Sequence, residues 1–194
     1  MSADWPFGDL KPLRYGLILA DPPWRFRTWG EHNQQKSASK HYALMDMDAL
    51  KALPVNQLAT DNAALVMWGI WSMLPQAIDL METWGFKFKT GGDWAKQSKT
   101  GKSWAFGTGY LFRGASEPFI VGTIGKPKIG DRSIRNLIVA PVREHSRKPP
   151  EMHDNLERLF PTIARAELFA RSSRPGWDSW GNEVGKFTEA ANGN

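Results

Sequence analysis

Residues 15–24 read YGLILADPPW, an apolar run that ends in an acidic residue, two prolines and a tryptophan. Six almost wholly apolar residues are the length of a strand that is buried on both faces, and such strands are typical of parallel sheets. The turn residues Asp21, Pro22 and Pro23 end the strand. We therefore expect residues 21–24 to lie at the carboxyl end of a parallel strand, which is where ligands bind in sheets of this kind.

Buried strands alternate with helices along the rest of the chain. Apolar runs predict further strands at Ala63–Gly69, Glu117–Thr123, Asn136–Ala140 and Arg165–Ala170. Apolar residues at helical spacing predict helices at Asp46–Leu53, Val55–Thr60, Ser72–Trp84 and Pro150–Phe160. This order predicts an α/β fold with a mostly parallel sheet and helices on both faces. We expect one domain over residues 1–194, with a flexible tail at 185–194.

Two stretches between these elements lack the periodicity of a strand or a helix. Arg25–Lys40 is polar, and Asp93–Gly114 is rich in glycine, lysine and tryptophan. We expect both stretches to be loops. Loops of this length in a compact domain are commonly functional.

The composition excludes several kinds of chemistry. The 194 residues contain no cysteine, which excludes disulfides, thiolate metal ligands and a cysteine nucleophile. The four histidines have no metal-ligand spacing, so we expect no metal cofactor. The first residues lack the features of a signal peptide, and the longest apolar run is far shorter than the roughly 18 residues of a membrane span. We expect a cytoplasmic protein with no membrane partner.

The tetrapeptide at 21–24 suits the activation of an aromatic amine. The lone pair of such an amine is delocalised into its ring, so the nitrogen is a poor nucleophile until fixed oxygens accept its hydrogens. The Asp21 carboxylate and the Pro22 carbonyl are suitable acceptors, because Pro22 and Pro23 fix two φ angles. Trp24 offers a flat face on which a base can stack. The alternative is a rigid turn that only ends the strand.

Further motifs follow this tetrapeptide in a set order. They are YALM at 42–45, a glycine-rich stretch with Trp104, Gly109, Tyr110, Arg113 and Glu117, HSRKP at 145–149, ELFAR at 167–171 and WGNE at 180–183. Together with DPPW, this set resembles the MT-A70 family of adenine-N6 methyltransferases over nearly the whole chain, and its short bacterial and phage members most. The resemblance implies a Rossmann-like fold with the catalytic strand before the cofactor strand. It also implies transfer of a methyl group from S-adenosylmethionine to the N6 amine of adenine.

The resemblance implies roles for individual residues. The catalytic residues are Asp21, Pro22, Pro23 and Trp24. The residues expected to bind S-adenosylmethionine are Asp9, Leu10, Asp21, Lys148, Glu167, Arg171, Asn182 and Glu183. Lys148 is expected to pair with the methionine carboxylate, and Glu183 suits a ribose because a carboxylate accepts from two hydroxyls. Glu167 is equally compatible with a structural role as a buried partner of Arg171.

The net charge of +5 favours an anionic partner, and the resemblance implies a nucleic acid. The residues expected to contact it are Trp24, Tyr42, Lys96, Lys99, Lys102 and Arg113. The cations among them alternate with Trp94, Trp104 and Tyr110, which suits phosphate contacts combined with base stacking. A solvated loop is the alternative for this segment.

Three other functions are compatible with parts of the pattern. DNA is the favoured substrate. The same reaction on RNA is the first alternative, because DNA and RNA are distinguished by contacts to the 2′-hydroxyl, and nothing in the sequence shows such contacts. Cytosine-N4 methylation is the second, but those enzymes usually carry serine at the position of Asp21. The third is an inactive scaffold that binds nucleic acid for a partner. A domain of this size leaves little room for target recognition, so we expect low sequence specificity, a homodimer or a partner subunit.

Overall fold

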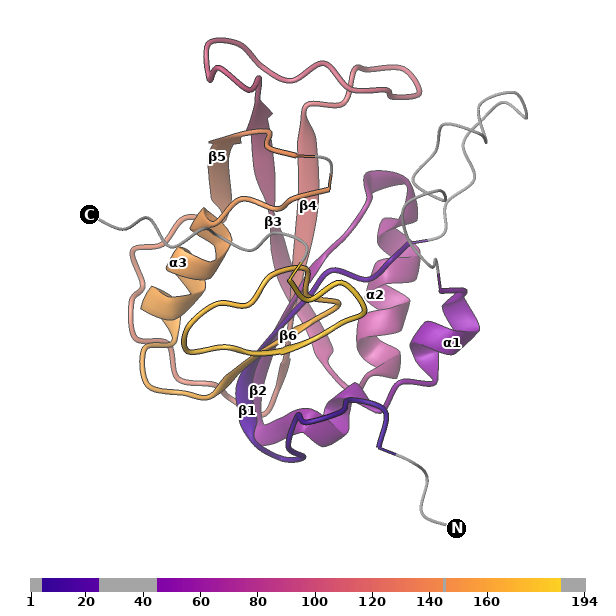
Figure 1. The fold of residues 1–194 in the computed structure, drawn as a ribbon, viewed down its shortest axis with the longest axis vertical. Helices are drawn as coiled ribbons and strands as arrows, with labels where there is room; N and C mark the ends of the chain where they lie inside the picture. The colour runs from indigo at the N-terminus through magenta and orange to yellow at the C-terminus, as the bar shows by residue number, and fades with distance from the viewer. Residues whose placement is uncertain (1–4, 25–44, 145, 186–194) are drawn as a thin grey trace.

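One seven-stranded sheet organises the chain. The computed structural model describes residues 5–24, 45–144 and 146–185. The strands are β1 (Tyr15–Ala20), β2 (Ala59–Trp68), β3 (Lys87–Gln97), β4 (Ser116–Ile124), β5 (Leu137–Pro141), β6 (Arg165–Leu168) and β7 (Asp178–Trp180). They lie in the order β5-β3-β4-β2-β1-β6-β7 (Figure 1). The α-helices are α1 (Met47–Lys51), α2 (Leu74–Thr83) and α3 (Glu151–Leu159).

β1 lies in the interior of the sheet because its side chains have no polar face to turn to water. All six of its residues are buried, and it pairs in parallel with β2 on one side and with β6 on the other. The strand predicted at Tyr15–Ala20 is therefore confirmed. As a consequence, Asp21 follows β1 at a point flanked by the carboxyl ends of two parallel neighbours.

Among the described strands, β4 alone runs against the others. It pairs antiparallel with β2 and β3, whereas the pairs β1–β2, β1–β6, β3–β5 and β6–β7 are parallel. This arrangement confirms the expected α/β fold with a mostly parallel sheet. It also directs the ends of β1 and β3 toward the same edge of the sheet.

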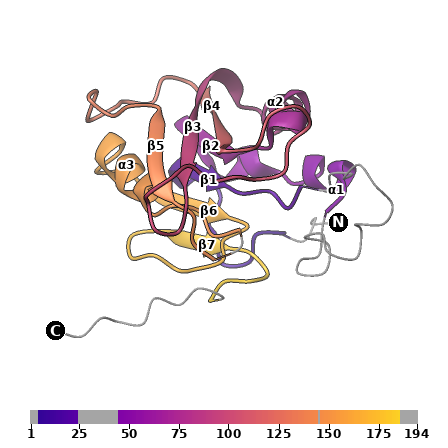
Figure 2. The ribbon, with the colours of Figure 1, turned by 90° about the horizontal axis from the view of Figure 1, so that it is seen from above.

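Helices cover both faces of the sheet, as expected. Ile18 and Ala20 of β1 belong to the apolar core shared with α1 and α2, and Leu17 and Leu19 belong to the core shared with α3. This alternation follows from the two-residue period of a strand. Figure 2 shows α3 on one side of the sheet and α1 with α2 on the other. Among the described residues, every helix is too short or too polar to span a membrane.

The longer helices begin and end near the predicted residues. α3 starts directly after Pro150, and α2 ends before Trp84 and Gly85, where Gly85 has a φ of 84° that favours glycine. The predicted helix Ser72–Trp84 is shorter than expected because Trp71–Met73 forms a 3-10 turn. α1 covers only the middle of the predicted Asp46–Leu53, with the Asp46 side chain capping it.

The prediction that Asp93–Gly114 is entirely loop is wrong. Asp93–Gln97 forms the second half of β3, which lies between β4 and β5. The sequence KFKTGGDWAKQ has no apolar pattern that would predict a strand, because Trp94 is the one buried residue of β3. Two glycines let the neighbouring backbones approach: a Cβ on Gly91 would lie 2.6 Å from the carbonyl oxygen of Phe119, and one on Gly92 would overlap the carbonyl oxygen of Asn136.

Two smaller predictions also need correction. Val55–Thr60 was expected to be helical, but only Val55–Leu58 forms a 3-10 turn, and the following residues open β2. β7 was not expected at all, because three residues are too few to carry a strand pattern. It is placed by its parallel pairing with β6.

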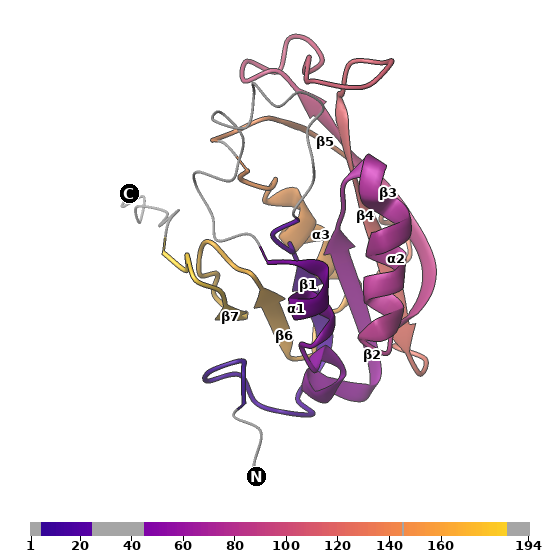
Figure 3. The same ribbon diagram turned by 90° about the vertical axis from the view of Figure 1, so that its right-hand side faces the viewer.

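The connection from β3 to β4, residues 98–115, extends beyond the sheet, and we name it the β3–β4 extension (Figures 1 and 3). Isolated bridges between Gln97 and Trp104 and between Gly107 and Gly114 hold it together. Its side chains are unusually exposed for their kind, with Phe106 at 80% and Phe112 at 86%. Because β1 and β3 end at the same edge, the extension begins on the side of the sheet where Asp21 lies.

We predict that Gly92→Ala destabilises the protein, because the added methyl group overlaps the carbonyl oxygen of Asn136 and forces β3 away from the segment leading into β5. The free energy of unfolding should fall by roughly 1–3 kcal/mol, the usual cost of overpacking. Urea unfolding followed by tryptophan fluorescence measures this change. The control is Gly69→Ala, whose added methyl would have the carbonyl oxygen of Pro118, at 3.8 Å, as its nearest neighbour. Equal stability of the two variants would contradict the prediction.

A buried phenol ties β1 to β7. The Tyr15 hydroxyl donates to Asp178 Oδ2 at 2.7 Å, although 163 residues separate the two in sequence. Burial, supported by this hydrogen bond, raises the pKa of Tyr15 to about 12. The neutral phenol therefore stabilises the folded state at every pH below its usual pKa of 10.0, and this contribution is lost as the pH rises through about 12.

We predict that Tyr15→Phe lowers the free energy of unfolding by about 1 kcal/mol at pH 8, the net worth of one hydrogen bond. The difference between wild type and variant should shrink as the pH rises above 10, because only the wild type carries the perturbed phenol. Urea unfolding at pH 8 and pH 11 tests both parts. A difference that stays constant with pH would show that the phenol does not titrate as described.

Candidate active site

A cavity of about 470 Å³ opens at the carboxyl ends of β1 and β6. It is lined by Asp21, Arg143, Ser146, Arg147, Lys148, Pro150, His153, Glu157, Glu167, Phe169, Arg171, Ser172, Ser173, Arg174 and Pro175. These residues come from the end of β1, the segment before α3, α3 itself, β6 and the segment after β6. The expectation that residues 21–24 lie at the carboxyl end of a parallel strand beside a ligand site is thus confirmed in its geometry for Asp21, which meets Arg171 from the segment after β6 at this edge.

The Asp21 carboxylate is paired with the Lys148 ammonium. Lys148 Nζ lies 2.9 Å from both Asp21 Oδ1 and Oδ2, and the two side chains are 14% and 18% exposed. Lys148 also lies 2.9 Å from Glu117 Oε1 on β4, and Glu117 Oε2 lies 2.6 Å from Lys96 Nζ on β3. Four residues from four segments therefore form one chain of alternating charges, which we name the charge chain.

The charge chain holds its members in their charged forms. Burial disfavours the charge of Lys148, but the attraction of Asp21 and Glu117 outweighs it and raises the pKa of the ammonium above its ordinary value. Burial likewise opposes the charge of Glu117, yet Lys148 and Lys96 together lower its pKa to about 2. Both groups are therefore ionised at neutral pH.

The turn after β1 is fixed by two hydrogen bonds. The Trp24 peptide N–H donates to the Pro22 carbonyl at 2.8 Å, and the Trp24 indole N–H donates to the Trp68 carbonyl at 3.2 Å. Trp24 is buried at the end of β2 as a result. The Pro22 carbonyl has a second lone pair, so it keeps the capacity to accept one further hydrogen.

Glu167 faces the cavity from β6 and pairs with a histidine rather than with Arg171. Its Oε2 lies 2.9 Å from His153 Nε2 on α3, and the His153 ring meets Trp177 edge to face at 4.9 Å between centroids. Glu167 is thus both a lining residue of the cavity and a half-buried partner of His153, which is not the partner considered from the sequence.

Arg171 connects three parts of the site. Its guanidinium donates to the Ser146 carbonyl at 3.2 Å and lies 3.8 Å from the carboxylates of both Asp21 and Glu183. Glu183 is thereby brought toward the cavity without lining it, whereas Asn182 is exposed. Of the motif WGNE, then, the structure connects Glu183 to the charged cluster and leaves Asn182 at the surface.

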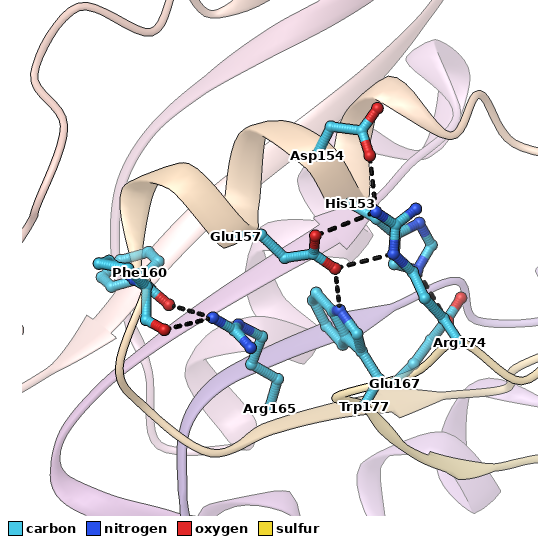
Figure 4. A network of polar contacts seen from close by, with 9 residues as sticks. His153, Asp154, Glu157, Phe160, Arg165, Glu167, Arg174 and Trp177 are labelled. Carbon is cyan, nitrogen blue, oxygen red and sulfur yellow. Dashed lines mark hydrogen bonds and ion pairs between the residues drawn. The ribbon is translucent and has the colours of Figure 1, made fainter.

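The outer wall of the cavity is fastened to α3 by charged contacts (Figure 4). Arg174 binds Glu157 through two hydrogen bonds of 2.7 and 3.0 Å, and it reaches Asp154 at 2.6 Å. The Trp177 indole N–H also donates to Glu157, at 2.8 Å. Glu157 therefore sets the position of the segment that follows β6.

Two lining residues have strained backbones. Ser146 and Phe169 have φ angles of 64° and 61°, in the left-handed region that residues with a Cβ rarely adopt. Both line the cavity, and both are tied to neighbours: Arg171 binds the Ser146 carbonyl, and Phe169 packs edge to face on Trp180. Strain of this kind is common at functional sites.

Asp9 and Leu10 line a second cavity of about 370 Å³, together with Trp177 and Asp178. Ser173 lines both cavities, so the two adjoin across the segment after β6. Leu10 is buried and Asp9 is exposed. The two residues expected near the cofactor from the start of the chain thus lie beside the main cavity, on the far side of Ser173.

The residues expected to contact nucleic acid divide into three groups. Lys99, Lys102 and Arg113 are exposed on the β3–β4 extension, and Arg113 lies over the Phe106 ring at 5.1 Å. Lys96 belongs to the charge chain and lies 4.8 Å over the Trp94 ring. Tyr42 lies outside the described residues.

Several residues of the site were not predicted from the sequence. Glu117 was noted only as part of the glycine-rich motif, and His153, Glu157 and Arg174 were given no role. Glu117 carried one usable signal, because a carboxylate within the apolar strand SEPFIVGTI needs a buried partner. The residues on α3 gave none, since a polar helix face is normally solvated. Among the described residues, no group of histidine and acidic side chains could hold a metal ion.

A mostly parallel sheet with an Asp-Pro-Pro-Trp turn at the end of an interior strand, beside a cavity that carries both signs of charge, defines a Rossmann-like methyltransferase. The model of the MT-A70 family matches residues 15–183. This chain belongs to the MT-A70 family.

Its relatives include bacterial and eukaryotic proteins. The type II methyltransferase M.MunI of Mycoplasma sp is 30% identical over 93% of this chain and 82% of its own length. The N(6)-adenosine-methyltransferase MT-A70-like protein of Arabidopsis thaliana is 31% identical over 94% of this chain but 26% of its own length. The human N(6)-adenosine-methyltransferase catalytic subunit METTL3 is 26% identical over 88% and 28%. This chain therefore spans most of the first relative and about a quarter of the other two.

We predict that Glu157→Gln weakens the binding of S-adenosylhomocysteine about three- to tenfold, because Arg174 and Trp177 lose their ionised partner on α3 and the wall formed by the segment after β6 keeps only the contact of Arg174 with Asp154. The free energy of unfolding should fall by only about 1 kcal/mol, since the pair is partly exposed. Calorimetric titration measures the affinity. The matched control is Asp131→Asn, which frees Arg158 of α3 from an ion pair of 2.7 Å among residues that line neither cavity. The same affinity in both variants would refute the role of Glu157.

Proposed function

We propose that this chain transfers the methyl group of S-adenosylmethionine to the N6 amine of adenine in DNA. The observation that carries the proposal is the Asp21 carboxylate, which lies in the cavity at the end of β1 with both oxygens 2.9 Å from the Lys148 ammonium. It is followed by the Pro22 carbonyl and by Trp24. Membership of a family whose relatives are named adenosine and adenine methyltransferases supports the same reaction.

Asp21 and Pro22 supply the two acceptors that the adenine amine needs. With both hydrogens accepted by fixed oxygens, the nitrogen lone pair leaves conjugation with the ring and becomes available to a methyl donor. No strong base is needed before the attack, because the amine becomes acidic only after it is methylated. Most of the rate enhancement then comes from alignment and preorganised charge. Trp24, held by the Trp68 carbonyl, is the proposed stacking partner of the base.

The cavity fits the amino-acid end of S-adenosylmethionine because both charges are present. Lys148 and Arg171 suit its carboxylate, and Asp21 and Glu167 suit its ammonium group. The adjoining cavity with Asp9 and Leu10 suits its adenine. Asn182 and Glu183 are the proposed ribose contacts, of which Glu183 is already near Arg171. When bound, the cofactor supplies the electrophilic methyl group.

The β3–β4 extension is the proposed contact surface for the nucleic acid. Residues 98–115 contain the cations Lys99, Lys102 and Arg113 and no acidic residue. Exposed aromatic rings stand among these cations, which suits backbone phosphates and unpaired bases. Tyr42 and Lys96 are proposed to act nearer the target base. A second copy of the chain or a partner subunit is proposed to add target recognition.

DNA is proposed over RNA because this chain spans 82% of the type II methyltransferase M.MunI but only 26% of the Arabidopsis relative that is named for adenosine. RNA is the second candidate, since the Arabidopsis relative is named an adenosine methyltransferase and is 31% identical. A double-stranded target must flip its adenine into the cavity, which costs a few kcal/mol of unstacking. Unpaired strands avoid this cost.

We predict that the protein transfers labelled methyl from S-adenosylmethionine to DNA, and that Asp21→Ala lowers the rate at least about a hundredfold, as expected for a preorganised electrostatic group. The assay compares matched single-stranded DNA, duplex DNA and RNA, with nucleoside analysis of the product. Asp79→Ala is the control, because Asp79 is an ion-paired carboxylate on α2 that lines neither cavity.

Four outcomes separate the candidates. N6-methyladenine that forms in DNA and depends on Asp21 supports the proposal, whereas product only in RNA supports the second candidate. Cofactor binding without transfer to any of the three substrates would point to a missing partner. A protein that does not bind the cofactor at all would be an inactive scaffold.

A further inference from the structure

The Lys148 ammonium contacts two carboxylates. Its Nζ lies 2.9 Å from both oxygens of Asp21 and 2.9 Å from Oε1 of Glu117. The two oxygens of one carboxylate lie too close together to take separate N–H groups of an ammonium, so Asp21 occupies one donor of Lys148 and Glu117 occupies a second. The ring of Trp68 lies below Nζ, with 5.5 Å from Nζ to the ring centroid. To give a cofactor carboxylate more than its third N–H, Lys148 must turn away from Asp21.

The two carboxylates that share Lys148 differ in their surroundings. Asp21 lines the cavity, whereas Glu117 lies behind Lys148 on β4, outside the lining. Glu117 is also bound by Lys96 at 2.6 Å, in the middle of three paired strands. Asp21 has a second cation as well, the Arg171 guanidinium at 3.8 Å. Asp21 can therefore give up Lys148 to a ligand in the cavity without becoming an unpaired anion. Glu117 does not line the cavity, so a ligand bound there would not take Lys148 from it.

The charge chain lies against a cluster of buried aromatic rings. Trp68 meets Trp94 and Phe119 edge to face, with centroid distances of 6.3 and 5.7 Å, and all three rings are buried. Glu117 is paired in register with Trp94 on β3. Charges next to such a surface are poorly screened by water, so the attraction between a lysine and a carboxylate is stronger there.

We propose that Glu117 is a positioning residue that anchors Lys148 while Lys148 turns from Asp21 to the cofactor carboxylate. The exchange frees the Asp21 oxygens for the amine of the target adenine. Cofactor binding and readiness of Asp21 are then one event, and Glu117 keeps Lys148 in place during it. This inference rests on the proposed function, and it adds Glu117 to the residues that function requires.

The proposal makes the preference for a carboxylate-bearing ligand depend on Glu117. Without Glu117, the Lys148 ammonium has Asp21 as its one remaining carboxylate among those described, and leaving it becomes costly. S-adenosylhomocysteine carries the carboxylate that Lys148 binds, and 5′-methylthioadenosine is the same molecule without its amino-acid end. Glu117→Gln should therefore weaken S-adenosylhomocysteine about tenfold and change the affinity for 5′-methylthioadenosine less than about twofold.

Calorimetric titration of both ligands into wild type, Glu117→Gln, Glu117→Asp and Asp79→Asn tests this. Glu117→Asp keeps the charge and should restore part of the lost affinity. Asp79→Asn removes an ion-paired carboxylate on α2 and should bind both ligands as the wild type does. The affinity for 5′-methylthioadenosine also shows whether the cavity of the Gln variant is intact, so a folding defect is recognised as an equal loss for both ligands.

The outcomes distinguish this inference from the proposed function. A selective loss for S-adenosylhomocysteine in Glu117→Gln supports the anchoring role. Equal losses for both ligands, or no loss for either, overturn it while the binding of S-adenosylhomocysteine by wild type leaves the proposed function standing. Failure of the wild type to bind S-adenosylhomocysteine would overturn both.

Discussion

The ion pair between Asp21 and Lys148 joins residues that are 127 positions apart, and the rest of the structure can be understood as the means of holding them together. Asp21 is placed by the burial of β1 between β2 and β6. Lys148 is placed by the segment that leads into α3, whose apolar side packs against the opposite face of the same sheet. A shift of either element would separate the pair, and among the described residues Asp21 would then keep only the Arg171 guanidinium at 3.8 Å while Lys148 would keep only Glu117.

Charged contacts, rather than apolar packing, build most of the cavity wall. Arg174, Glu157 and Asp154 fasten the segment after β6 to α3, and Arg171 joins the same segment to Ser146. Such contacts are directional, so they fix where a wall stands while leaving its inner surface polar. A polar inner surface suits a ligand that carries both a carboxylate and an ammonium group, and this follows from how the wall is made.

The sequence predicted those parts of the fold that are apolar on a regular period. β1 and α3 were predicted almost to the residue, because burial on both faces or on one stripe leaves a strong pattern. β3 was not predicted as a strand because most of its side chains are not buried and leave no apolar pattern. It pairs with its neighbours through its backbone, and its two glycines allow those backbones to approach closely. The site divides in the same way. Asp21 and Lys148 belong to recognisable sequence motifs. The ion pair of Glu117 with Lys148 depends on the pairing of β4 with β2 and β3, which no local sequence pattern predicts.

The β3–β4 extension does not take part in the register of β3 and β4. β3 and β4 are already paired over Lys87–Ala95 before it begins, so its residues do not decide how the strands align. A change in its length or composition would leave the charge chain and the cavity in place. The proposed catalytic cavity and the proposed contact surface for the nucleic acid are thus separate parts of the chain, so the extension can be exchanged without rebuilding the charge chain.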